Sequence, residues 1–321
     1  MPALSLPPPA PGPARPDPAG PERVWPETNC YTDLWLTLLR ALGREPRAAL
    51  SFTVAQDFEG DQFTFFKVPP EDLRALYGLE VQELAIYDRV EAHAAVQLRL
   101  GRPVLVEVDG HHLPDTRGTS YRAGHVKTTI AILGLDEDAR RLDYIHNTGR
   151  FTLEGEDYDG LFHRRPAERD RTDRLFPYVE FVKPAGPALA EGELRAAAAG
   201  RLAGHLARRP AVNPVAAYRA AFPEHLAALA GRPMAHFHLY AFNTLRQLGA
   251  NFELLGVHLR WLGGPEAAAE SCDALAASAK TLQFQLARAV SRRRFDDCGA
   301  LLGGMERAYD QALDALVRRY G

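Results

Sequence analysis

The chain has 321 residues, of which 46% are hydrophobic and 25% charged, and a formal net charge of −3. This balance is typical of a globular protein with one large core or two smaller ones. It predicts no general attraction to nucleic acid or to anionic membranes, and no stretch approaches the roughly 20 apolar residues of a spanning helix. Three scattered cysteines are too few for a disulfide framework or a zinc ribbon. We therefore expect a soluble, cytoplasmic protein.

Residues 1–22, MPALSLPPPAPGPARPDPAGPE, are dominated by Pro, Ala and Gly. Such a segment has few large apolar side chains and cannot bury enough surface to offset the entropy of ordering. The composition predicts a disordered tail, partly in polyproline conformation. A solvated tail is favoured over a ligand for a Pro-recognising partner.

Residues 23–186 alternate between helix-like and strand-like patterns, which predicts an α/β domain. A helix is expected over CYTDLWLTLLRALG, residues 30–43, because its leucines recur at helical spacing. Thr28 or Asn29 can cap this helix, and Gly43 can end it. The remaining expected elements are a strand over 62–68, helices over 69–78 and 90–101, and strands over 103–109, 125–136, 140–147 and 178–184. The strands over 125–136 and 140–147 are expected to form a hairpin.

Residues 187–321 have a different character, because Ala and Leu dominate and no strand-like alternation remains. Pro or Gly separates five predicted helices over 189–208, 214–230, 234–262, 265–290 and 293–319. We predict a bundle of four or five helices. The expected fold class is α+β, with a papain-like domain followed by this all-helical domain.

Three residues form the predicted catalytic group. Cys30 opens the first helix directly after Asn29, where the helix N-terminus favours the thiolate and backbone N–H groups can hold an oxyanion. His125 at the head of a strand can act as the base, and Asn147 at the end of the paired strand can orient the imidazole. Asp143 competes with Asn147 for that role. A buried, unreactive Cys30 is the alternative that the sequence leaves open.

The segment over residues 103–136 resembles the butirosin-type aminoacyltransferases. The matching positions are Val108-Asp109, Leu113-Pro114, His125 and Gly134-Leu135-Asp136, together with the early pair Asn29-Cys30. The chain is more similar still to a related uncharacterised bacterial family, often encoded beside carrier proteins and the ligases that load amino acids onto them.

This resemblance implies a papain-like enzyme that takes an acyl or aminoacyl group from the phosphopantetheine thioester of a carrier protein. The group would pass through Cys30 to a small amine acceptor. No cofactor is expected on the chain itself, since the phosphopantetheine belongs to the partner. Val24 and Trp25 depart from the glutamine that papain-class peptidases have before the cysteine, and the relatives usually have an Asp as third residue. The alternatives are a papain-like hydrolase, either peptidase or thioesterase, and a non-catalytic binding module.

Asn29, Asp109 and Tyr240 are the predicted substrate-binding residues. Asp109 follows a buried strand and can bind an amine, although capping of a turn is an equal alternative. Tyr240 belongs to an aromatic-rich segment over 235–256 whose rings cannot share one helical stripe, so we expect some of them to wall the site.

No metal site is predicted. His236 and His238 face apart on a helix, and His258 adds no acidic partner at ligand spacing. His111 and His112 can assist acid–base chemistry, but polar loop residues of this kind are common. The basic run over 292–294 is either a solvated turn or a docking point for an acidic carrier protein.

Overall fold

The computed structural model describes residues 4, 23–165, 175–295 and 298–321, so the predicted tail over 1–22 lies outside the described residues apart from Leu4. The chain divides into two compact units that alternate along the sequence. The first contains Asn29–Pro46 and Pro70–Ala188, and the second contains 23–28, Arg47–Pro69 and Leu189–Gly321. The predicted boundary after residue 186 lies close to the break at Ala188, whereas 23–28 and 47–69 belong to the second unit.

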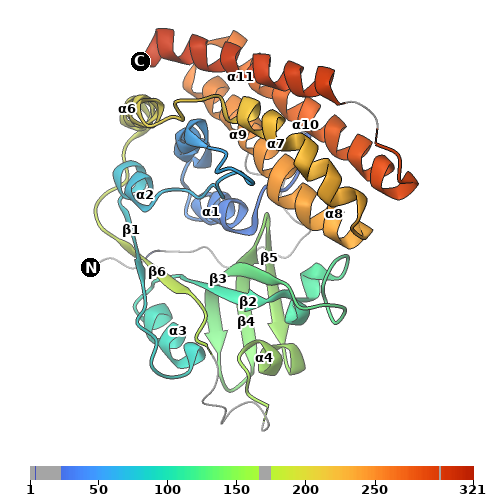
Figure 1. The fold of residues 1–321 in the computed structure, drawn as a ribbon. Coiled ribbons are helices and arrows are strands. Elements are labelled where there is room, and N and C mark those ends of the chain that lie inside the picture. The colour runs from blue at the N-terminus through green and yellow to red at the C-terminus, as the bar shows by residue number, and fades with distance from the viewer. Residues whose placement is uncertain (1–3, 5–22, 166–174, 296–297) are drawn as a thin grey trace. The chain divides into compact units, whose positions relative to one another are not determined.

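The first unit is a mixed α+β structure built on one antiparallel sheet of strand order β1-β6-β2-β3-β4-β5 (Figure 1). The strands are β1 (Leu79–Glu83), β2 (Val104–Asp109), β3 (Lys127–Asp136), β4 (Arg141–His146), β5 (Gly149–Glu154) and β6 (Val179–Pro184). The helices are α1 (Cys30–Ala41), α2 (Pro70–Tyr77), α3 (Val90–Arg99) and α4 (Glu156–Leu161). The predicted β3–β4 hairpin is confirmed, with Ile130 opposite His146 and Asp136 opposite Arg141.

The strand predicted over 62–68 is wrong. Among the described residues of this segment only Phe63 pairs, through an isolated bridge to Phe58. Both rings pack against Tyr218, with centroids 5.6 Å from Phe58 and 5.3 Å from Phe63. Phe58 and Phe63 therefore belong to an aromatic side-chain cluster of the second unit and not to a sheet.

The two faces of the sheet have different coverings. Even-numbered residues of β3 and β4, such as Ile130 and Tyr144, join a buried core that includes Ala94 of α3 and Tyr158 of α4. Since successive side chains of a strand point to opposite faces, the odd-numbered residues of β3 before its register shift at Ile132–Gly134 point the other way. Beyond the shift the parity reverses, and Leu135 packs against the same core. α1 contacts β3 and β4, and Cys30 at its start meets Thr129.

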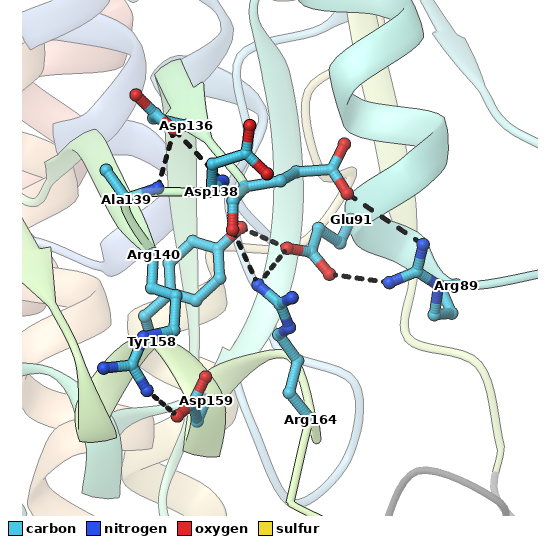
Figure 2. A network of polar contacts seen from close by, with 10 residues as sticks. Arg89, Glu91, Asp136, Asp138, Ala139, Arg140, Tyr158, Asp159 and Arg164 are labelled. Carbon is cyan, nitrogen blue, oxygen red and sulfur yellow. Dashed lines mark hydrogen bonds and ion pairs between the residues drawn. The ribbon is translucent and has the colours of Figure 1, made fainter.

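A buried carboxylate joins α3 to α4. Glu91, only 1% exposed, accepts a hydrogen bond from the hydroxyl of Tyr158 and pairs with Arg89 at 3.2 Å and Arg164 at 3.3 Å (Figure 2). Arg164 also donates to the carbonyl of Glu137 at 3.0 Å. Burial, reinforced by the adjacent Glu91 carboxylate, raises the pKa of Tyr158, so its hydroxyl remains a donor. Both carboxylate oxygens of Glu91 are occupied by these contacts, which is consistent with a structural role.

The second unit is helical. Its helices are α6 (Glu191–Ala207), α7 (Pro214–Ala230), α8 (Met234–Ala241), α9 (Gln247–Leu262), α10 (Glu266–Arg292) and α11 (Gly299–Tyr320), and a 3-10 helix covers Pro46–Ala55. α10 packs against α9 and α11, and α11 against α6 and α7. The single helix predicted over 234–262 is interrupted by a π-helical segment, Phe242–Arg246. In the described ranges no helix has the length and apolar character needed to cross a membrane.

Trp25 explains why residues 23–28 belong to the helical unit. Its side chain is 2% exposed, and its indole Nε1 donates to the carbonyl of Ala276 at 3.1 Å. The backbone N–H groups of Val24 and Trp25 donate to the two carboxylate oxygens of Glu253 at 2.5 and 2.9 Å. Gly249 leaves room for the ring, because a Cβ there would lie 2.5 Å from Nε1. Val24 and Trp25 therefore anchor the chain to α9 and α10.

Candidate functional site

Cys30 is the first residue of α1. Asn29 is the N-cap, with extended backbone angles, and its side-chain oxygen accepts a hydrogen bond from the Thr32 N–H at 2.9 Å. An N–H at the first position of a helix has no intrahelical acceptor, so the Cys30 N–H can serve an incoming oxyanion. The thiol is not in a disulfide and is half-buried. Asn29 is predicted to bind substrate, but its amide oxygen is engaged in the cap.

The sulfur of Cys30 faces β3. Its Sγ lies 3.8 Å from Oγ1 of Thr129, which stands opposite Glu107 of β2. The next residue of α1, Tyr31, donates its hydroxyl to Glu180 of β6 at 2.8 Å. The first turn of α1 therefore lies over the strands β6, β2 and β3, on the face of the sheet that bears Thr129 and Glu180.

His125 forms a pair with Asp109. The distance between Nδ1 of His125 and Oδ2 of Asp109 is 2.5 Å, and Asp109 also accepts from the N–H groups of His111 at 3.0 Å and Val126 at 3.3 Å. Partial burial raises the pKa of Asp109, but these hydrogen bonds outweigh that effect and hold the pKa below its ordinary value. Because an ionised carboxylate only accepts, Nδ1 carries a proton and Nε2 is the basic nitrogen of the neutral ring. The His125 side chain is 76% exposed and its ring stacks on His111 at 4.6 Å.

The residue that orients His125 is Asp109, whereas the sequence predicted Asn147. Asn147 lies in the turn after β4, with a φ of 49°, and its carbonyl accepts from the Thr37 hydroxyl at 2.9 Å. The hairpin register ends at Ile130 opposite His146, so Asn147 lies just beyond the paired residues, and among the described residues no hydrogen bond joins it to His125. Asp143, the competitor, pairs with Gly134 near the far end of β3 and accepts from Thr152.

Cys30 and His125 belong to the same face of the sheet without being hydrogen-bond partners. Asp109 is opposite Lys127, so the side chains of Asp109, Lys127 and Thr129 share the face that Cys30 meets. His125 precedes Thr129 by four residues, and its ring pairs with Asp109, which stands opposite Lys127, two residues from Thr129. The strands over 103–109 and 125–136 were not predicted to pair with each other. An antiparallel pairing of these two strands would have placed Asp109 next to His125.

Comparison with known families gives two adjoining matches. The DUF1839 N-terminal domain matches residues 15–184, and the DUF1839 C-terminal domain matches residues 191–318. The chain belongs to the DUF1839 family. No curated protein matches it.

A second Asp–His pair in this DUF1839 protein was missed by sequence reasoning. His146 places Nδ1 2.5 Å from Asp115 and Nε2 2.8 Å from the hydroxyl of Thr128, and Tyr144 donates to the other oxygen of Asp115 at 2.5 Å. All four side chains are buried. Because both ring nitrogens are engaged, His146 is not available as a base. The pair instead fixes the loop between β2 and β3, from which His111 and His125 project.

Tyr240 of the DUF1839 chain lies in a polar cluster of the helical unit. Its hydroxyl is 2.7 Å from that of Tyr218 and 3.0 Å from Nδ1 of His225. Burial raises the pKa of Tyr240 to about 12, so the hydroxyl stays protonated. The predicted role of Tyr240 in substrate binding, and of its helical segment in walling the site, stays a prediction.

His258 and the two remaining cysteines are buried in the helical unit. His258 is fully buried, with Nδ1 2.8 Å from the carbonyl of Arg47, and Cys272 and Cys298 are buried. Among the residues whose placement the structure describes, no group of three or more His, Cys, Asp or Glu side chains is arranged to hold a metal.

Proposed function

We propose that this DUF1839 protein is a cysteine-dependent acyltransferase. It moves an aminoacyl group from the phosphopantetheine thioester of a carrier protein to a small amine, through a thioester on Cys30. The observation that carries the proposal is the placement of Cys30 at the start of α1 on the sheet face that also bears the Asp109–His125 pair. The similarity of the segment over 103–136 to butirosin-type aminoacyltransferases supports a carrier-protein thioester as the acyl donor.

A papain-like arrangement for the first unit is part of the proposal. Two features support it: a helix that begins at the candidate nucleophile, and an antiparallel sheet that packs against that helix. The histidine precedes a strand of the same sheet and is oriented by a carboxylate, which is the logic of a nucleophile–base–orienter group.

The first step is thioester exchange. The thiolate of Cys30 attacks the carbonyl carbon of the donor thioester, a new sulfur–carbon bond forms, and the carrier thiol leaves and takes up a proton. A thiolate at a helix N-terminus is stabilised by the helix dipole, so this step does not need an imidazole in contact with the sulfur. The Cys30 N–H stabilises the oxyanion of the tetrahedral intermediate.

The second step is aminolysis. The acceptor amine attacks the Cys30 thioester, Nε2 of His125 accepts a proton from its nitrogen, and the Cys30 sulfur leaves as the amide forms. A base for the acceptor must lie about 3 Å from the amine nitrogen, which itself approaches the carbonyl carbon to about 3 Å. The acceptor amine therefore lies between the base and the sulfur, which requires Nε2 of His125 to come within about 8 Å of Sγ. Asp109 stabilises the imidazolium that results.

A non-catalytic binding module is the second candidate, and one observation favours it. An activated cysteine usually has its base within hydrogen-bond reach, and next to Cys30 that position holds the hydroxyl of Thr129. A threonine hydroxyl cannot take the thiol proton at neutral pH.

A transfer assay separates the candidates. The full chain is incubated with the glycyl thioester of N-acetylcysteamine and ethanolamine, and the products are identified by mass spectrometry. An amide product that Cys30→Ala abolishes and Cys298→Ala retains supports the acyltransferase. Free glycine alone, again dependent on Cys30, identifies a hydrolase. Turnover absent from the intact chain favours the binding module.

A further inference from the structure

The helical unit contains a pocket of about 220 Å³ beside the π-helical segment. Its lining residues are Glu59, Gln62, Phe63, Thr64, Phe65, Asn243 and Gln247. All of them belong to the second unit, so the pocket is complete within that unit. Its volume equals roughly seven waters of the liquid, which is the size of a small organic molecule.

Gln247 lines this pocket, and its side chain carries a buried acceptor. The residue is 1% exposed, its Nε2 donates to the carbonyl of Phe242 at 3.4 Å, and its Oε1 has no partner among the described residues. The Phe242 carbonyl can only accept a hydrogen bond, so the Gln247 side-chain atom that contacts it is the amide nitrogen. The other terminal atom of the Gln247 side chain is therefore the oxygen. A buried acceptor without a donor is costly, and most such groups are satisfied by a ligand or an ordered water. π-Helical segments such as Phe242–Arg246 occur frequently at functional sites.

The remaining walls favour a cation. Glu59 is the only ionisable residue of the lining, and Asp57 and Asp61 flank it along the chain. Phe63 is buried and Phe65 is 44% exposed, so an aromatic ring borders the opening. The Nδ2 of Asn243 donates to the Leu239 carbonyl at 2.8 Å, which leaves its Oδ1 as an acceptor. A carboxylate, amide oxygens and aromatic rings together match the donors and positive charge of an ammonium group.

We infer that this pocket binds a small primary ammonium compound. Its N–H groups donate to Oε1 of Gln247, its charge is balanced by Glu59, and its alkyl chain lies against Phe65. The inference stands without the proposed function, because it makes no use of Cys30. It adds a ligand site in the helical half of the chain and defines the chemical class of the ligand.

Calorimetric titration of the full chain with three probes tests this inference. Butylammonium supplies both charge and N–H donors, tetramethylammonium supplies charge alone, and 1-butanol supplies the chain with a neutral hydroxyl. We expect butylammonium to bind about tenfold more tightly than either of the other two. Gln247→Met should weaken butylammonium binding about tenfold, because it removes the acceptor of the N–H groups. Glu59→Gln should weaken it severalfold, because it removes the negative charge that balances the ammonium group.

Matched variants control for general effects of these changes. Gln283→Met removes another amide oxygen that is buried without a partner, and Glu270→Gln removes an exposed carboxylate of α10. Both should bind butylammonium as the unchanged protein does. If Gln247→Met does not fold, Phe65→Ala replaces it, with Phe284→Ala as its control, since both rings are well exposed. Equal affinity for butylammonium and 1-butanol, or no measurable binding of butylammonium, would overturn the inference.

Discussion

Sγ of Cys30 lies 3.8 Å from Oγ1 of Thr129, and no imidazole occupies that position among the residues that the structure describes. In the proposed mechanism the N–H groups at the start of α1, and not an imidazole, assist the reaction at Cys30. The Asp109–His125 pair, which joins the end of β2 to the residues before β3, acts in that mechanism on the acceptor and not on the sulfur. This division of roles makes the two half-reactions separable by mutation.

Thr129→His should increase the reactivity of Cys30, because it places a base beside the sulfur. We expect carbamidomethylation of Cys30 by iodoacetamide at neutral pH to become about tenfold faster, measured by mass spectrometry over time. Thr119→His adds an imidazole at an exposed loop position and should leave the rate unchanged. An unaltered rate in a folded Thr129→His protein would contradict the contact between the two side chains.

Changes at the Asp109–His125 pair should slow aminolysis and spare thioester formation. We expect His125→Ala to reduce amide formation by about 10²-fold and Asp109→Asn by a smaller factor, while the rate of Cys30 acylation stays within about twofold. Single-turnover kinetics with the glycyl thioester, quenched with acid, measure both steps. Asn147→Ala and Asp143→Ala are the controls. An equal loss of acylation in His125→Ala would mean that the imidazole acts on the thiol.

His112 should make the first unit sensitive to mild acid. Burial, reinforced by the neighbouring His111, lowers the pKa of His112 below its ordinary 6.5. The unfolded chain then binds more protons than the folded one, so stability is complete above about pH 6.5 and falls as the pH drops below it. We expect the urea midpoint to decrease between pH 7 and pH 5, and His112→Gln to reduce that decrease. His238→Gln changes an exposed position of the second unit, and its urea midpoint should depend on pH as that of the unchanged protein does.

Gly249→Ala should destabilise the second unit. Its methyl group would lie 2.5 Å from the indole nitrogen of the buried Trp25, so the ring or the helix must move. Overpacking of this kind costs about 1–3 kcal/mol, which urea denaturation can resolve. Gly200→Ala in α6 meets no atom within 4 Å and should stabilise by a few tenths to about 1 kcal/mol. Equal stability of the two variants would refute the close packing of Trp25 against α9.

Local signals in the sequence located most elements but not the partners of the site. The Asn29 cap fixed the start of α1, and a charged turn with apolar runs on either side identified the β3–β4 hairpin. β5 and α4 were missed because each has six residues and packs through few of them. The orienting residue was missed because it depends on register: the pairing of Asp109 with Lys127 is a contact between strands that periodicity does not specify.

Intact-mass analysis of the full chain after mixing with the glycyl thioester of N-acetylcysteamine is the most direct test of the central claim. We expect one added glycyl group, mapped by fragmentation to Cys30, absent from Cys30→Ala and retained in Cys298→Ala. An adduct that persists in Cys30→Ala would move the nucleophile elsewhere. The absence of any adduct from the unchanged protein, across glycyl, alanyl and glutamyl thioesters, would contradict the acyl-enzyme itself.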